Sequence, residues 1–502
     1  MSRLPRIAAL ALLAAALLVA PTHAQDVLVG ATPGGAFYTI AVPDQWNGGL
    51  VIYNHGFSLT PGAPGPDLGP LQALQLVEGY AVAASSYQQV GWAVFKTNQD
   101  LEQLVDVFQQ EVGQPSHVLL FGVSLGGIVT ARAIEQANLG NVVGALTICG
   151  AMAGSRNWDL GLDGRLGYDA ICGDVPGAAI PGGPNGLALG SDLDIDDVVL
   201  AMNVCFGHDL PPSARTGAQQ ARLDQFLEFS QIPQSFINRS LGFFTVFAMA
   251  DLVYDPDKLG GGNGIGNANV DYGDPVINAN IERFTPTAAR RRRLRRNYTP
   301  TGNVGNVKIV SIHTDQDGLV IVENESEYAS VVPPGNLTVG VVQEATPTHC
   351  GFTQTETIAA WETLRAWVAG DPQPSALTLQ VMCKAIEPTF GGPCRFNPFF
   401  QIPDMDGRAR PRNAGVEVRA PRTVKASVAG SAPPAAAKAP AAKPSAAPQP
   451  AAPAPSAAPQ EAPQRAGQPQ IARSPRRAQP ADELEEAPAA ARRLRRLERQ
   501  ER

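Results

Sequence analysis

The sequence lacks an excess of basic charge, a long apolar run beyond its first 20 residues, and any closely spaced cysteine pair. Its 502 residues carry 39 Lys and Arg against 46 Asp and Glu, which gives a net charge of −7. Nothing in this balance indicates a nucleic-acid partner, and we expect no transmembrane span after the N-terminus. No C-x-x-C spacing indicates a metal site. Two acidic runs, at 192–197 and 251–257, do not match an EF-hand loop and are interpreted as surface acid.

The N-terminus has the pattern of a signal peptide over residues 1–24. Arg3 and Arg6 precede an apolar stretch at 7–20, and residues 22–24 form an acceptable cleavage site, so the mature chain is expected to begin at Gln25. An uncleaved anchor is the less favoured alternative because the apolar stretch is short for a membrane span. We therefore expect a secreted or periplasmic protein.

The cysteine count is even, at six, which in an oxidising compartment indicates disulfides. Cys383 and Cys394 flank a Gly-Gly-Pro turn and are predicted to pair. Cys172 and Cys205 fall within one inserted segment, and we pair these as well.

Short apolar strands alternate with helical patterns, which predicts an α/β fold with a mostly parallel sheet. This rhythm breaks between residues 155 and 302, which are interpreted as a lid inserted between two parts of the core, 25–154 and 303–370. Residues 371–405 are expected to form a disulfide-pinned extension. The lid shows helical patches at 218–229 and 281–296. Predicted strands of the core lie at 36–42, 50–53, 79–84, 118–121, 142–148, 307–312 and 338–342, and predicted helices at 71–77, 98–112 and 355–368.

Residues 406–502 have a composition dominated by Ala, Pro, Gln, Lys and Arg. Too few large apolar side chains are present to offset the entropy cost of ordering, so we predict a disordered tail. Its basic end suggests a weak contact with an acidic cell-envelope surface, although a solvated tail without a function is the favoured interpretation.

The pattern Gly122-Val123-Ser124-Leu125-Gly126 follows the apolar run at 118–121 and precedes apolar residues at helical spacing. Ser124 is therefore expected on a sharp turn from a strand to a helix, where flanking glycines permit unusual backbone angles. The plain alternative is a serine that only caps a helix. A serine hydroxyl needs a base to become a nucleophile.

Two downstream loops offer an acid and a base. Asp317 follows the strand predicted at 307–312, and His349 lies in a loop before the last core helix. Asp315 competes with Asp317 as the acid, and His313 competes with His349 as the base but directly follows the strand. Cys149 ends the strand predicted at 142–148, and Cys350 lies in the histidine loop, so the two either form a third disulfide near the site or remain buried thiols.

Together these motifs resemble secreted α/β-hydrolases of the serine esterase and lipase kind. The match rests on the serine turn, the Asn54-His55-Gly56-Phe57 loop, the D-x-x-V pattern from Asp317 to Val320, and His349. The resemblance covers about residues 26–153 and 303–370, and implies that these loops meet at one edge of the sheet.

The resemblance also implies roles for individual residues. Ser124 would be the nucleophile, His349 the base and Asp317 the acid that orients it. The backbone N–H groups of Phe57 and Leu125 would form an oxyanion hole, and no cofactor or metal is expected. His55 precedes the serine and is interpreted as ordering the oxyanion loop.

We expect hydrolysis of small-molecule or polymeric carboxylic esters through an acyl-enzyme. An amidase or peptidase with the same three residues is the nearest alternative. A non-catalytic envelope-binding protein that acts through its basic tail is the alternative of another class, and the full Ser, Asp and His set argues against it.

Overall fold

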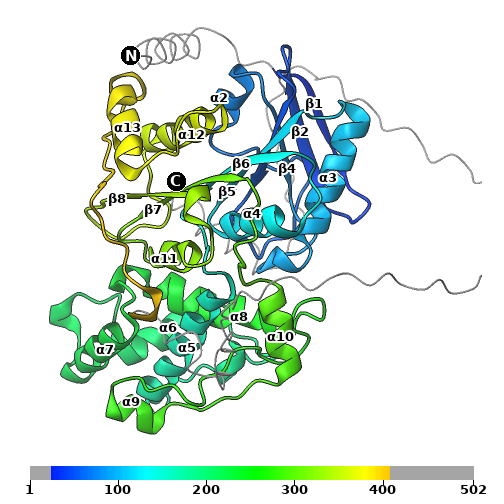
Figure 1. Cartoon of the computed structure of the whole chain (residues 1–502). Helices are drawn as coiled ribbons and strands as arrows, with labels where there is room; N and C mark the ends of the chain where they lie inside the picture. Colours follow the sequence, from blue (N-terminus) through cyan, green and yellow to red (C-terminus); the bar gives the residue numbers. More distant parts are fainter. Residues whose placement is uncertain (1–23, 408–502) are drawn as a thin grey trace, which may run out of the picture. The chain divides into compact units, whose positions relative to one another are not determined.

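The computed structural model describes residues 24–407, and one eight-stranded sheet lies at its centre (Figure 1). Its strands are β1 (Ala24–Ala31), β2 (Phe37–Pro43), β3 (Gly49–Asn54), β4 (Ala81–Ser85), β5 (His117–Val123), β6 (Val142–Ile148), β7 (Lys308–Thr314) and β8 (Leu337–Val342). They lie in the order β1-β2-β4-β3-β5-β6-β7-β8. The pairings of β2 with β1 and with β4 are antiparallel, and the other five are parallel. The predicted α/β-hydrolase fold with a mostly parallel sheet is confirmed.

Side chains along the central strands alternate between two hydrophobic cores, because successive residues of a strand point to opposite faces. Val118 and Leu120 of β5 belong to one core, and Leu119 and Phe121 belong to the other. Both faces are therefore covered, which explains why the parallel strands are continuous apolar runs. The first core packs against α3 (Thr97–Glu111) and α4 (Leu125–Gln136), and the second against α2 (Gln72–Val77), α12 (Gln354–Val368) and α13 (Ala376–Phe390).

A long insertion joins β6 to β7 and contains most of the remaining helices (Figure 1). It has its own small core, which includes Tyr168, Phe206 and Phe226, and the Cys172–Cys205 disulfide joins two of its helices. Its helices are α5 (Asn157–Cys172), α6 (Ile195–Phe206), α7 (Gly217–Ser230), α8 (Met249–Tyr254), α9 (Pro275–Asn280) and α10 (Ala288–Arg296), with a π-helix (Ile237–Ala248) that runs directly into α8.

The helix predicted over 281–296 is correct only for its second half. Residues 281–287 are not helical, and α10 begins at Ala288. Pro286 disfavours a helical conformation in the residue before it, and the Thr287 hydroxyl accepts a hydrogen bond from the N–H of Arg290, which is N-cap geometry. The proline and the cap together set the start of the helix.

Among the described residues, one helical segment, Gln234–Tyr254, is long and apolar enough to cross a membrane when judged by length and composition. It contains the π-helix and α8. In the structure 61% of its most apolar window is buried inside the protein. A buried core helix passes the same test, so this is weak evidence for a span.

The C-terminal extension consists largely of α13, which packs on α12. The Cys383–Cys394 disulfide joins α13 to the segment that follows it, as expected from the sequence. The described chain extends to Gly407, and Asp406 forms an ion pair with Arg156 at 2.8 Å. The tail predicted from residue 406 is therefore too long by two residues, because Asp406 and Gly407 belong with the folded part. The expected signal peptide up to residue 23 and the tail beyond 407 lie outside the described residues.

The helix α4 crosses β3 at very short range, and Gly126 permits this approach. A Cβ atom at Gly126 would lie 1.9 Å from the Asn54 carbonyl oxygen. Side-chain contacts reinforce the crossing, because the Asn54 amide donates a hydrogen bond to the Thr130 hydroxyl of α4 at 2.8 Å. The start of α4 is thus held against the end of β3.

We predict that Gly126→Ala lowers the free energy of unfolding by about 1–3 kcal/mol, since the helix and strand must move apart to admit the methyl group. Urea unfolding followed by circular dichroism measures this change. The control is Gly217→Ala at the start of α7, where a Cβ has no neighbour within 4 Å. Equal stability of the two variants would show that the crossing is not tight.

Candidate active site

Ser124 lies on the turn between β5 and α4, with φ 56° and ψ −121°. Positive φ is unusual for a residue with a side chain and stores backbone strain. The surrounding structure maintains it: the Ser124 N–H donates to the Ile148 carbonyl at 2.9 Å, and a Cβ at Gly122 would lie 2.2 Å from the Gly126 carbonyl oxygen. The sharp turn predicted from the glycine pattern is present.

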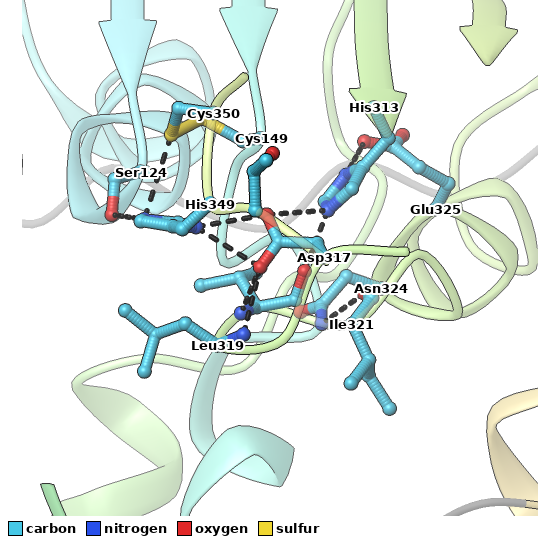
Figure 2. A network of polar contacts seen from close by, with 12 residues as sticks. Ser124, Cys149, His313, Asp317, Leu319, Ile321, Asn324, Glu325, His349 and Cys350 are labelled. Carbon is cyan, nitrogen blue, oxygen red and sulfur yellow. Dashed lines mark hydrogen bonds and ion pairs between the residues drawn. A yellow bond between two sulfur atoms is a disulfide. The ribbon is translucent and has the colours of Figure 1, made fainter. Parts of the chain in front are cut away.

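His349 and Asp317 approach Ser124 in a continuous chain of hydrogen bonds (Figure 2). The Ser124 Oγ lies 2.9 Å from His349 Nε2, and His349 Nδ1 lies 2.8 Å from Asp317 Oδ2. A carboxylate only accepts hydrogen bonds, so Nδ1 carries the hydrogen and Nε2 is left to accept the serine proton. The structure thus brings together the three residues that the sequence selected as nucleophile, base and acid.

The acid loop holds Asp317 through its own backbone. The N–H groups of Leu319 and Val320 both donate to Asp317 Oδ1 at 2.8 Å. The side chain of Asp317 is fully buried, whereas that of His349 is 6% exposed. Asp315 has a different partner, since its Oδ1 accepts from the Glu344 N–H at 2.9 Å. Of the two candidate acids, Asp317 is the one that contacts His349.

A disulfide between Cys149 and Cys350 connects the end of β6 to the loop that carries His349 (Figure 2). The two cysteines are 201 residues apart in sequence, and both have positive φ, 46° and 61°. Cys350 directly follows the histidine, and its Sγ lies 3.5 Å from His349 Nε2. The bridge therefore ties the histidine loop to the strand next to the serine turn.

The two expected oxyanion donors belong to segments beside Ser124. Leu125 is the first residue of α4, so its N–H has no partner within the helix. Gly56 approaches the serine closely, because a Cβ added to it would lie 3.4 Å from Ser124 Cβ. Phe57 and Leu125 both line the cavity in front of Ser124.

His55 contacts the backbone of the loop that carries Phe57. Its Nδ1 donates to the Gly56 carbonyl at 2.8 Å, and its ring stacks on Tyr87 with centroids 4.1 Å apart. The Tyr87 hydroxyl donates to the His55 carbonyl at 3.3 Å. Burial lowers the pKa of His55 and outweighs the backbone hydrogen bonds, which favours the neutral ring. This arrangement agrees with an ordering role for His55.

A cavity of about 850 Å³ opens in front of Ser124 between the core and the insertion. The insertion also touches the acid loop directly: the Ser240 hydroxyl of the π-helix donates to the Gly318 carbonyl at 2.8 Å. The aromatic side chains of the wall are Phe57, Trp92, Trp158, Phe229, Phe244 and Tyr272.

Apart from Phe57, these wall residues are not marked by any pattern in the sequence. Phe229 and Tyr272 come from parts of the insertion that are 43 positions apart in the numbering of the chain, yet their rings lie 5.6 Å apart. No local spacing marks such a pair, because it depends on how the helices pack. The sequence offers one indication of this wall, namely aromatic residues in an insertion that lacks the strand-and-helix alternation of the core.

Only one group of potential metal ligands occurs in the described part of the chain, namely Cys149, His349 and Cys350. The two sulfur atoms form the disulfide and so cannot act as thiolates. Neither acidic run forms such a group. In the first, Asp194 caps α6 by accepting from the Asp197 N–H, and in the second, Asp251 pairs with the buried Lys258.

Comparisons with known proteins find limited similarity. No family model matches the chain. The o-phthalyl amidase of Xanthobacter agilis is 26% identical over 151 residues, which is 29% of this chain and only 32% of that protein. An esterase from Rhodococcus sp. ECU1013 is 15% identical over 68% of this chain and 98% of its own, with a TM-score of 0.32. Candida antarctica lipase A in its closed state is 11% identical over 74% and 94%, with a TM-score of 0.36.

We predict that replacing Cys149 and Cys350 together by Ala lowers the free energy of unfolding by about 5 kcal/mol, since the bridge closes a long loop of the unfolded chain. Replacing Cys383 and Cys394, which are 11 residues apart, is the matched control, with an expected loss of about 3 kcal/mol. Denaturant unfolding of the oxidised variants measures both. Equal losses would contradict the dependence on loop length.

Proposed function

We propose that the protein is a secreted serine hydrolase that cleaves carboxylic esters through an acyl-enzyme. The observation that carries this proposal is the hydrogen-bonded chain from Ser124 through His349 to Asp317, which opens onto the aromatic-walled cavity. Binding alone requires no such chain. A strained serine next to a histidine of defined tautomer is instead the arrangement that nucleophilic catalysis requires.

In the proposed acylation step, His349 Nε2 takes the proton of Ser124 Oγ as the oxygen attacks the ester carbonyl carbon. A C–O bond forms, and the carbonyl oxygen becomes an oxyanion. His349 then gives its proton to the departing alcohol oxygen as the original ester bond breaks. The products of this step are the free alcohol and the acyl group bound to Ser124.

Asp317 and the backbone donors stabilise the charges that appear during this step. The Asp317 carboxylate faces Nδ1 and stabilises the imidazolium. The N–H groups of Phe57 and Leu125 would bind the oxyanion, and each such donor is worth about 2.7–4 kcal/mol in other hydrolases. The N-terminus of α4 adds the positive end of its dipole.

Deacylation repeats the same chemistry with water. His349 takes a proton from a water molecule, whose oxygen attacks the acyl carbonyl, and then returns a proton to Ser124 Oγ as the acyl bond breaks. The acid product leaves, and the enzyme regains its starting protonation. No external redox partner or cofactor enters the cycle.

The insertion is proposed to act as a lid that shapes the acyl or alcohol pocket. Its residues supply much of the cavity wall, including Trp158, Phe229 and Tyr272. An aromatic wall favours substrates that have a sizeable apolar group beside the ester. Secretion is part of the proposal because three disulfides suit an oxidising compartment.

Amide hydrolysis is the second candidate, and the partial similarity to an amidase favours it. The same serine, histidine and acid perform both reactions. The difference lies in the leaving group, since an amine must be protonated by His349 before it departs.

We predict that a fluorophosphonate probe labels Ser124 and that mass spectrometry locates the adduct on the peptide containing it. His349→Ala should prevent labelling, because the serine then loses its base. Asp317→Asn should lower kcat by about 10⁴-fold, as the loss of the acid does in other serine hydrolases.

The matched control for the acid is Asp315→Asn, which removes a nearby carboxylate that does not contact His349. It should retain labelling and most of the activity. Failure of the wild-type protein to react with both the fluorophosphonate and a small sulfonyl fluoride would refute the serine hydrolase proposal.

We predict faster turnover of an aryl ester than of the amide with the same acyl group and a matched leaving group. Values of kcat/KM for such pairs give the preference directly, and Ser124→Ala supplies the background rate. A higher kcat/KM for the amides would make amidase the correct function and would leave the proposed catalytic residues unchanged.

A further inference from the structure

We propose that His313, held by Glu325, is a positioning residue that fixes the acid loop and electrostatically supports the Asp317 carboxylate behind His349. This inference rests on the proposed hydrolase function, because it assigns a role within that reaction. His313 was set aside as a candidate base, and the structure gives it no contact with Ser124. It lies instead on the far side of Asp317 from His349 (Figure 2).

His313 fixes the acid loop through Val320. Its Nε2 lies 2.7 Å from the Val320 carbonyl oxygen, which only accepts, so Nε2 carries a hydrogen. The N–H of the same valine donates to Asp317 Oδ1 at 2.8 Å. Val320 is thus held by His313 through its carbonyl oxygen, and it holds the Asp317 carboxylate through its N–H.

Glu325 holds the other ring nitrogen. His313 Nδ1 lies 3.0 Å from Glu325 Oε1, which also accepts from the Ser311 hydroxyl at 2.7 Å. Ser311 in turn accepts from the Thr147 hydroxyl of β6 at 2.8 Å. Since Nε2 is already a donor, a further proton is shared between His313 and Glu325 in this fully buried pair.

The pair presents its positive end to Asp317. His313 Nε2 lies 3.8 Å from Asp317 Oδ2, and both side chains are fully buried, so the attraction is little screened. Burial lowers the pKa of His313, but the hydrogen bond and charge of Glu325, the charge of Asp317 and the Val320 carbonyl outweigh it. The pKa of His313 is therefore raised above its usual value.

Stability alone does not account for this arrangement. A buried ion pair usually contributes little net stability, because removing both charges from water costs about as much as their attraction returns. The same pair next to a catalytic acid offsets the cost of burying the Asp317 charge while His349 is neutral. Its benefit therefore lies in the resting site, before His349 takes the serine proton.

Other titratable groups also lie near this network and contribute to its electrostatic potential. Glu344 lies near Asp317 from the histidine loop and pairs with Arg395 at 3.6 Å. Tyr328 lies near Glu325 from α11 (Asn324–Ala329). These groups are unchanged in the variants described next, so they do not alter the comparison.

The test compares three variants: His313→Gln, Glu325→Gln, and the double variant that carries both changes. Glu327→Gln is the control. Glu327 is an acid of the same helix that pairs with Arg156 at 2.8 Å instead. The pH dependence of ester kcat/KM and the ¹⁵N NMR titration of His313 are measured, with circular dichroism to verify folding. The NMR titration does not depend on activity.

We expect the acid limb of kcat/KM to move to higher pH, by about 0.5–1 unit, in both single variants. The Asp317 charge is then less compensated, and an uncompensated carboxylate favours the charged form of a base beside it. We also expect kcat to fall about tenfold with KM nearly unchanged. The double variant should be no worse than either single variant, because the two residues act as a unit. Glu325→Gln should lower the pH at which His313 titrates, and Glu327→Gln should leave the limb in place.

An unchanged acid limb, a shift to lower pH, or an unchanged His313 titration in Glu325→Gln would overturn the inference. These results are distinct from a failure of the proposed function. Wild-type protein that neither hydrolyses esters nor labels at Ser124 refutes the hydrolase proposal and the positioning role together. Normal labelling with an unmoved limb refutes the positioning role alone.

Discussion

The close crossing of α4 over the end of β3 is the constraint on which the site depends. Gly126 permits the crossing, and the crossing places Ser124 at the carboxyl edge of the sheet with a strained backbone. The parallel arrangement of β5, β6 and β7 brings the serine turn, Cys149 and the acid loop to the same edge. The positions of Ser124, Cys149 and Asp317 are thus a consequence of strand direction and of one short helix-to-strand distance.

Several parts of this arrangement could be predicted because their signals are local. The turn at Ser124 follows from a strand, two glycines and a helix in immediate succession. The D-x-x-V pattern favours Asp317 over Asp315, and the structure explains this spacing, since the Val320 N–H donates to the Asp317 carboxylate. A short-range hydrogen bond leaves a short-range pattern in the sequence.

Other parts could not be predicted because they depend on tertiary packing. His313 and Glu325 are 12 residues apart, and they become neighbours only because α11 packs next to the end of β7. The aromatic wall of the cavity depends on how the insertion folds over Ser124. The start of α10 differs from the prediction, although Pro286 and the Thr287 cap mark it in the sequence.

The disulfide between Cys149 and Cys350 makes a covalent ring of the chain between these residues, and the whole insertion and the acid loop lie inside it. A protease that cuts the insertion at a single site therefore opens this ring without releasing a fragment. The serine strand, acid loop and histidine loop remain linked after such a cut. The disulfide thus keeps Ser124, Asp317 and His349 in one covalently linked molecule even when the chain of the insertion is cut.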